Sequence, residues 1–145
     1  MKKRLLLLVM MLHLLNPAWA FNLTDNGNGT VIDQDTGLIW QQGEGGDHNW
    51  QAAKGYCQGL QLAGGGWRLP EVRELESLIL DDRHSPATDP SFFPQVKSDG
   101  YYWSATPGAD NSSRAWDVDF GDGDVGRGGR GDGRHVRCVR ASGAR

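Results

Sequence analysis

A segment near the C-terminus, residues 121–135, combines arginines, aspartates and glycines in a pattern that suits ligand binding. It contains seven glycines and one apolar residue, Val125, so it can contribute little to a hydrophobic core. Its arginines are Arg127, Arg130 and Arg134. A guanidinium group can bind sulfate, phosphate or carboxylate through two parallel hydrogen bonds. The pattern therefore predicts an anion-binding surface, and a solvated hairpin or flexible loop is the alternative interpretation.

Four aspartates in and just before this segment are further candidates for the same site: Asp117, Asp119, Asp122 and Asp124. Alternation over residues 115–120 predicts a strand that turns Trp116, Val118 and Phe120 to one side and the first two aspartates to the other. We expect the four aspartates and the three arginines to form the ligand-binding site. No cofactor is expected, and whether these aspartates hold a metal ion such as calcium stays open.

Two helices should precede this region. The first is predicted over residues 47–62, where glycines 64–66 would end it and apolar side chains recur at helical spacing: Trp50, Ala53, Tyr56, Cys57 and Leu60. This stripe places Cys57 on the inward face. The second helix is predicted from Pro70, a favoured first-turn residue, to about Leu80, with Glu71 and Glu74 in its N-terminal turn.

Short strands are predicted at residues 30–32, 38–40, 102–104, 115–120 and 135–139. Residues 81–99 contain three prolines and should form a long loop, held down by Phe92 and Phe93. Helices followed by antiparallel strands indicate an α+β domain. Two metal sites are weaker alternatives: a calcium loop at Asp25, Asn26 and Asn28, which lacks the closing glutamate, and a cluster of Asp81, Asp82 and His84, which a polar loop explains equally well.

The first twenty residues carry the features of a secretory signal peptide. Lys2, Lys3 and Arg4 precede an apolar run over residues 5–15, and small residues surround a cleavage point after Ala20. The run is shorter than the roughly 20 residues that a membrane span needs. The remaining residues, 21–145, fit one domain. We therefore expect a secreted or periplasmic protein without a membrane span.

Charge argues against nucleic acid as a partner. The whole chain has 15 basic and 18 acidic residues, a formal net charge of −3. Three of the basic residues lie in the leader, so the exported part is more acidic still. A strongly basic surface is the usual mark of nucleic-acid binding. The remaining partner classes are a glycan, another surface macromolecule or a protein.

The two cysteines, Cys57 and Cys138, both lie in the exported part, where oxidation is permitted. We predict that they form a disulfide. Closing so long a loop would stabilise the fold by about 4.5 kcal/mol in the chain-entropy model. Free thiols and a metal-binding pair are the alternatives, although no Cys-x-x-Cys spacing is present.

Several short blocks resemble one known family. They are Trp67-Arg68-Leu69-Pro70 followed by Glu74, then Tyr102-Trp103-Ser104, Ala115-Trp116-Asp117 and Val136-Arg137-Cys138-Val139-Arg140. As a set they are similar to the Legionella collagen-like protein (Lcl) C-terminal domain family, a secreted group with a C-type-lectin-like fold. The resemblance extends from about Asn26 to Cys138. It implies two flanking helices, small antiparallel sheets, long irregular loops, and a disulfide from the helical Cys57 to Cys138 on a late strand.

The resemblance also bears on the ligand. Members of the family are associated with sulfated polysaccharides, which would suit the three arginines. Trp116-Asp117 is similar to the Trp-Asn-Asp strand of calcium-dependent lectins, but the chain has neither a Glu-Pro-Asn nor a Gln-Pro-Asp triplet, which puts calcium-dependent sugar binding in doubt. Related domains serve as variable proteins of diversity-generating retroelements, and the scattered polar residues near the C-terminus would suit such a role.

The remaining signature residues favour structural roles. We expect Arg68 and Glu74 to be polar partners, and four tryptophans to be core residues: Trp40, Trp50, Trp67 and Trp103. The formylglycine-generating enzymes share the lectin-like fold, but they need a cysteine pair near the C-terminus, so no enzyme activity is expected. We predict a secreted, adhesin-like or lectin-like binding domain for a polyanionic glycan or surface macromolecule. The alternative is an envelope assembly module that binds a protein.

Overall fold

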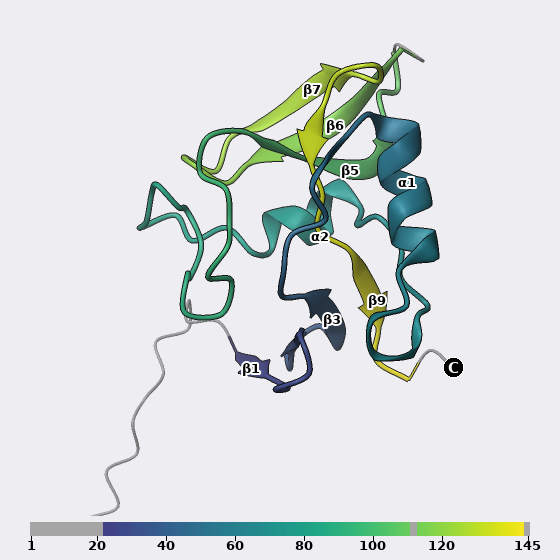
Figure 1. Ribbon diagram of the computed structural model, residues 1–145. Coiled ribbons are helices and arrows are strands. Elements are labelled where there is room, and N and C mark those ends of the chain that lie inside the picture. Colours follow the sequence, from purple (N-terminus) through teal and green to yellow (C-terminus); the bar gives the residue numbers. More distant parts are fainter. Residues whose placement is uncertain (1–21, 111–112, 144–145) are drawn as a thin grey trace, which may run out of the picture.

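The computed structural model describes residues 22–110 and 113–143, so the predicted signal peptide lies outside the described residues. Two sheets and two α-helices form an α+β fold (Figure 1), as predicted. The four-stranded sheet has the order β1-β2-β3-β9, with β1 (Leu23–Asp25), β2 (Thr30–Asp33), β3 (Leu38–Gln41) and β9 (Val139–Ala141). The five-stranded sheet has the order β4-β8-β5-β6-β7, with β4 (Asp47–His48), β5 (Tyr101–Pro107), β6 (Arg114–Asp119), β7 (Val125–Gly129) and β8 (Arg134–His135).

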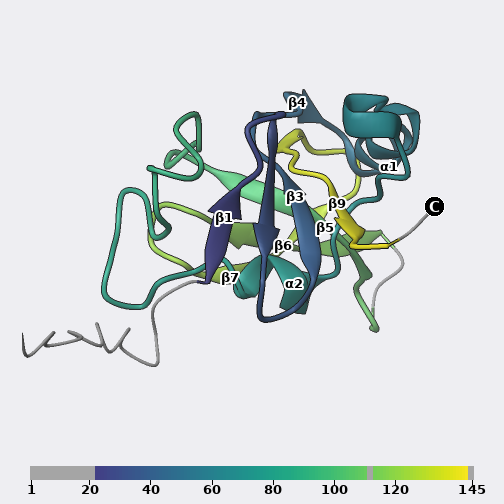
Figure 2. The same ribbon diagram turned by 90° about the horizontal axis from the view of Figure 1, so that it is seen from below.

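The small sheet joins the two ends of the described chain. β1, β2 and β3 are successive antiparallel strands, and β9 pairs with β3 so that Val139 lies opposite Trp40. Figure 2 shows β3 and β9 side by side. In the β1–β2 turn, Asp25 accepts a hydrogen bond from the Gly27 amide and Asn28 accepts one from the Thr30 amide. The polar residues of the suggested calcium loop therefore stabilise a turn.

The C-terminal segment enters the large sheet. β6 and β7 form an antiparallel hairpin, while β8 pairs with β4 and runs parallel to β5. Residues 121–135 therefore supply one strand of a hairpin, β7, and a second strand, β8, that joins the sheet elsewhere, so neither a solvated hairpin nor a flexible loop describes the whole segment. A continuous strand over residues 135–139 is wrong, because β8 and β9 belong to different sheets. Between them, the Val136 carbonyl accepts from the Gly45 amide and the Cys138 amide donates to the Gln41 side chain.

Helix α1 (Trp50–Gly59) is shorter than predicted at both ends. Asn49 caps its first turn by accepting a hydrogen bond from the Ala52 amide, because residues 47–48 pair with β8 instead. At the other end, residues 62–64 form a separate 3₁₀ turn. The inward stripe is correct, since Trp50, Ala53 and Cys57 are buried.

Helix α2 (Val72–Glu76) is also shorter than the predicted 70–80 span. Pro70 lies before the helix, and its carbonyl accepts from the Ala105 amide of β5. The Glu71 amide donates to the Glu74 side chain, which defines the start of the helix. Beyond Glu76 the chain continues in turns, and Leu78 is fully buried there.

The large sheet lies between two apolar clusters. One face packs with α2 and the small sheet, around residues such as Leu75, Tyr102 and Val118. The other face packs with α1, around Trp103 and Ala115. The four tryptophans expected in the core are buried there: Trp40, Trp50, Trp67 and Trp103. The long loop is held by the buried Phe93, as predicted.

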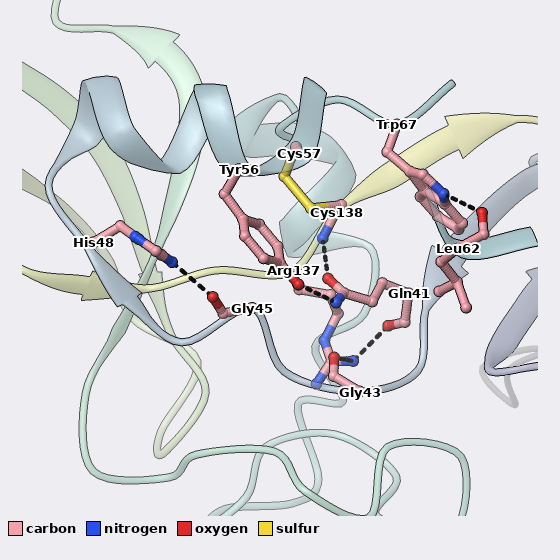
Figure 3. The surroundings of a disulfide bond; sticks show 10 residues. All are labelled: Gln41, Gly43, Gly45, His48, Tyr56, Cys57, Leu62, Trp67, Arg137 and Cys138. Carbon is pink, nitrogen blue, oxygen red and sulfur yellow. Dashed lines mark hydrogen bonds between the residues drawn. A yellow bond between two sulfur atoms is a disulfide. The ribbon is translucent and has the colours of Figure 1, made fainter. Parts of the chain in front are cut away.

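The predicted disulfide is present. Cys57 on α1 and Cys138 just before β9 are bonded, with their Cα atoms 5.5 Å apart. Figure 3 shows Tyr56 and Gln41 beside this bond, and the Tyr56 hydroxyl accepts a hydrogen bond from the Gln41 amide group at 2.8 Å. The bond joins α1 to the segment that connects the two sheets.

No helix within residues 22–110 and 113–143 is long and apolar enough to cross a membrane.

Candidate functional site

A pocket of about 440 Å³ opens at the end of the large sheet where β4, β8, β5 and β6 meet. Its lining residues come from distant parts of the chain: Asp47, Asp99, Gly100, Tyr101, Asp119, Gly133, Arg134 and His135. We call this the acidic pocket, because three aspartates line it against one arginine and one histidine. Asp119 and Arg134 are two of the residues that the sequence had suggested for binding.

Beside the pocket, Asp117 and Arg134 form a partly buried ion pair. Arg134 Nε donates to Asp117 Oδ2 at 3.1 Å, and the two side chains are 25% and 2% exposed, respectively. Burial raises the pKa of Asp117, although its hydrogen bond from Arg134 opposes the shift. The other carboxylate oxygen, Oδ1, is buried and makes no hydrogen bond within the described residues. Asp117 therefore holds Arg134 in place beside the pocket.

The alternation along β6 is as predicted, with Trp116, Val118 and Phe120 on one face and Asp117 and Asp119 on the other, but burial does not follow it. Val118 and Phe120 pack in the core with α2, and Asp117 lies opposite Trp103 of β5, in the layer covered by α1. Asp117 is buried, whereas Trp116 keeps part of its surface accessible. Arg134 covers Asp117, whereas Trp116 lines an open depression beside α2.

Glycines allow the close contacts around this ion pair. A Cβ atom at Gly126 would lie 2.7 Å from Asp117 Oδ1, and one at Gly128 would lie 2.8 Å from Asp117 Oδ2. At Gly133, a Cβ atom would lie 2.1 Å from the Asp47 carboxylate. Several glycines of the C-terminal segment are therefore packing requirements, which the flexible-loop interpretation did not foresee.

The acidic side chains dominate the electrostatics of the pocket. Tyr101 has a raised pKa because of burial and of the nearby aspartates, first among them Asp119. His135 Nε2 lies 3.4 Å from Asp99 Oδ1, and the Asp99 side chain is 83% exposed. Asp119 Oδ1 accepts from the Gly121 amide, which fixes that carboxylate at the end of β6. Such a site offers many hydrogen-bond acceptors beside an aromatic ring.

The remaining suggested site residues do not lie in the pocket. Asp122 and Asp124 are exposed in the β6–β7 turn, where the Asp122 side chain accepts from the Asp124 amide. Arg130 stacks on Trp50, with the guanidinium carbon 4.2 Å from the ring centre, and donates to the Arg114 carbonyl.

Arg127 lies on a different part of the surface. It pairs with Asp110 at 2.7 Å and lies beside Trp116, on the face of the sheet that α2 covers in part. Arg130 and Arg134 lie against Trp50 and Trp103 of the cluster on the other face, so the structure separates Arg127 from the other two arginines. Each of them also has an intramolecular partner.

Sequence reasoning missed Asp47, Asp99 and Tyr101. Asp47 had been placed at the start of a helix, and Asp99 at the end of a long loop. Only the pairing of β4 with β8 and of β8 with β5 brings these residues beside Arg134 and His135. A parallel contact between distant short strands leaves no local pattern in the sequence. One sequence feature could have pointed to Tyr101: in a strand, side chains alternate between faces, so it lies on the face opposite the buried Tyr102.

Two other charged pairs are structural. Arg68 holds Glu74 through two hydrogen bonds of 2.6 and 2.7 Å, as expected of polar partners. Burial opposes ionisation of Glu74, but the hydrogen bonds from Arg68 and Glu71 lower its pKa below the usual value. Arg137 is 1% exposed and pairs with Glu44.

No group of three or more histidine, cysteine, aspartate or glutamate side chains is placed to hold a metal ion in the part of the chain that the structure describes. This includes the suggested cluster of Asp81, Asp82 and His84, and the aspartates of the acidic pocket.

The disulfide, the two sheets and the polar pocket define a small α+β domain. The family model of the Lcl C-terminal domain matches residues 29–140. This range is most of the chain, so the chain belongs to that family, as the sequence motifs indicated. No curated protein matches the chain.

Proposed function

We propose that this protein is a secreted or periplasmic binding domain, adhesin-like or lectin-like, that recognises a glycan on a cell surface or in the surrounding matrix. The acidic pocket carries this proposal. It brings together a partly exposed tyrosine ring, three carboxylates, an arginine and a histidine from separate segments. Carboxylates and aromatic rings suit a hydroxyl-rich ligand, since the former accept hydrogen bonds and the latter stack. We propose that the ligand is bound without chemical change.

A C-type-lectin-like fold is part of this proposal. It is supported by a helical cysteine bonded to one near the last strand, and by a sheet that joins β1 to β9 through β2 and β3. The long stretch between α2 and β5 without regular strands provides loops next to the pocket.

The geometry favours a glycan over polyanions in general. Three carboxylates in the pocket would repel a highly sulfated chain. Arg127, Arg130 and Arg134 already interact with Asp110, Trp50 and Asp117, respectively. An acidic polysaccharide would have to compete with these partners. Retention on heparin, if present, should therefore be weak and should fall as salt is added.

The test is a glycan-array screen of the oxidised domain, residues 21–145, with and without a calcium chelator. Tyr101→Ala should abolish the signal, whereas Tyr101→Phe, which keeps the ring, should retain most of it. We expect the chelator to have no effect, and a loss of signal with chelator would restore the calcium proposal. Equal binding by Tyr101→Ala would show that the acidic pocket is not the site.

A silent array together with concentration-dependent oligomers would favour the assembly module instead. The proposed link to a retroelement has its own test, a reverse transcriptase gene and a template repeat in the neighbouring DNA.

A further inference from the structure

The face of the large sheet opposite the acidic pocket carries a second depression. This groove has a volume of about 450 Å³ and lies between α2 and the β6–β7 hairpin, lined by Val72, Arg73, Glu76, Trp116 and Val125. We call it the Trp116 groove. Val72, Arg73 and Glu76 come from α2, and Val125 lies next to Val118 of β6 in the hairpin register. The volume lies within the range of pockets that bind small molecules.

Trp116 differs from the other tryptophans that the structure describes. Trp40, Trp50, Trp67 and Trp103 are all at most 8% exposed, and each packs in one of the two cores. Trp116 belongs to neither core cluster and keeps part of its indole accessible. An accessible tryptophan on a rigid strand is costly to leave in water and offers a flat apolar surface to a ligand.

The apolar character of the groove extends beyond the indole. Val125 is the large apolar residue left exposed among the described residues, at 40%. It lies opposite Val118 in the strand pairing, two pairs away from Trp116 and Arg127 and on the same face of the sheet. Trp116, Val125 and Val72 form the apolar floor of the groove between α2 and the hairpin.

Charged groups of both signs surround this floor. Arg73 and Glu76 line it from the exposed side of α2, and neither forms an ion pair within residues 22–110 and 113–143. The guanidinium of Arg127 lies 5.2 Å from the centre of the Trp116 ring and is balanced by Asp110. The rim therefore offers donors and acceptors without a strong net charge.

We propose that the Trp116 groove binds a neutral pyranose ring of an oligosaccharide, independently of the acidic pocket. The apolar face of the sugar stacks on the Trp116 indole. Its hydroxyl groups donate to Glu76 and accept from Arg73 and Arg127. A strongly anionic sugar would meet Glu76 and Asp110, and a cationic group would meet the two arginines, so a neutral ring fits the balanced rim best.

The proposal is tested by NMR titration of the full exported domain with neutral hexasaccharides of glucose, mannose and galactose. We expect at least one of them to shift the indole N–H resonance of Trp116, which is assigned from the spectrum of Trp116→Phe. Trp116→Ala should weaken binding about tenfold or more. Trp116→Phe, which keeps a stacking ring, should retain more affinity than the alanine variant, and Glu76→Gln should weaken binding less.

Variants of the two sites separate this proposal from the proposed function. Tyr101→Ala should leave the groove titration unchanged, and Trp116→Ala should leave binding at the acidic pocket unchanged. A thermal melt of each variant confirms that it is folded. The proposal is overturned if none of the sugars shifts the Trp116 resonance, or if the folded Trp116→Ala variant binds as tightly as the natural protein. Loss of self-association in Trp116→Ala without any sugar binding would show that the groove is a protein contact.

Discussion

Asp117 and Arg134 are joined by a 3.1 Å hydrogen bond that links β6 to β8 across the intervening strand β5. The guanidinium of Arg134 also lies 5.5 Å from the Trp103 ring and 5.7 Å from the Tyr101 ring. The arginine is thus held between two aromatic side chains by a buried carboxylate. Its function is first to shape the acidic pocket, and only its remaining N–H groups are available to a ligand.

The buried carboxylate of Asp117 should give stability a distinct pH dependence. Because its pKa in the folded state lies above the ordinary value of 3.8, the folded state takes up a proton more readily than the unfolded state. As pH falls from 7 towards 4, the penalty for burying the charge is removed. The natural protein should therefore gain stability relative to Asp117→Asn, which does not titrate there.

Thermal melts of both proteins at pH 7 and pH 4 measure this difference. Glu74 and Asp110, whose pKa values are lowered, destabilise the fold as acid protonates them, but they do so in both proteins and cancel. The prediction is contradicted if the melting temperature of the natural protein, relative to that of Asp117→Asn, stays constant or falls between pH 7 and pH 4.

The glycines next to Asp117 should be sensitive to a single methyl group. Gly126→Ala and Gly128→Ala each place a Cβ atom within 2.8 Å of a carboxylate oxygen, so the ion pair must shift. We expect each to destabilise the fold by about 1–3 kcal/mol, typical of overpacking. Gly131→Ala is the matched control, because no atom lies within 4 Å of its added Cβ. Urea unfolding curves of the three variants provide the comparison, and equal midpoints for all three would refute the packing argument.

The fold class was predictable from the sequence because it depends on local patterns. The stripe from Trp50 to Cys57, the turns around Gly27 and Gly37, and alternation near Val118 each specify an element on their own. Element ends were less predictable. The first helix begins at Trp50 rather than at Asp47 because β4 forms with a distant strand, and no local pattern reports that pairing.

The candidate site was predictable only in part for the same reason. Arg134 and Asp119 were identified from composition and do line the pocket, but Asp47, Asp99 and Tyr101 come together only through the sheet. Arg127 and Arg134 are close in sequence, yet the β7–β8 turn sends them to opposite faces. Spacing alone could not show that, because the segment contains too few apolar residues to indicate which face is buried.

Arg137 should be the most important charged residue for stability. Its side chain is 1% exposed, pairs with Glu44, and donates to the carbonyls of Gln41, Gln42 and Gly43 at 2.6–3.1 Å. Figure 3 shows it reaching from the strand connection toward the loop at Gly43. Arg137→Met leaves the Glu44 carboxylate without its ion-pair partner, removes the hydrogen bonds to the three carbonyls, and should cost about 3–5 kcal/mol of unfolding free energy.

Chemical denaturation of a double-mutant cycle with Glu44→Gln checks this expectation. Burial already raises the pKa of Glu44 in spite of Arg137 and Tyr102. Replacing this carboxylate with a neutral amide in Glu44→Gln should therefore restore part of the unfolding free energy that Arg137→Met loses. The double variant should therefore be more stable than the sum of the two single losses predicts. Strict additivity would mean that the two side chains act independently.

The disulfide should contribute strongly to stability. Replacing Cys57 and Cys138 together with alanine removes a bond across a sequence separation of 81 residues. We expect a loss of up to about 4.5 kcal/mol in unfolding free energy, measured in denaturant under oxidising conditions. The control is the addition of a reductant to both proteins. It should lower the unfolding free energy of the natural protein, whose disulfide is reduced, and leave that of the variant unchanged. Equal stability of the natural protein and the variant under oxidising conditions would contradict this role.

The same bond also determines how the domain responds to mechanical load. If the two ends of the domain are pulled apart, tension passes from residue 57 to residue 138 through the sulfur atoms, and the chain between them carries none of it. That sheltered stretch contains α2, β5, β6, β7 and β8, together with Tyr101, Trp116 and Arg134. Strands β1 to β3 lie outside that stretch and would bear the load, as would β4 with Asp47 of the acidic pocket. The other residues of the acidic pocket and all lining residues of the Trp116 groove lie within the stretch, so force on the two ends would unfold β1 to β3 before it reached most of either surface.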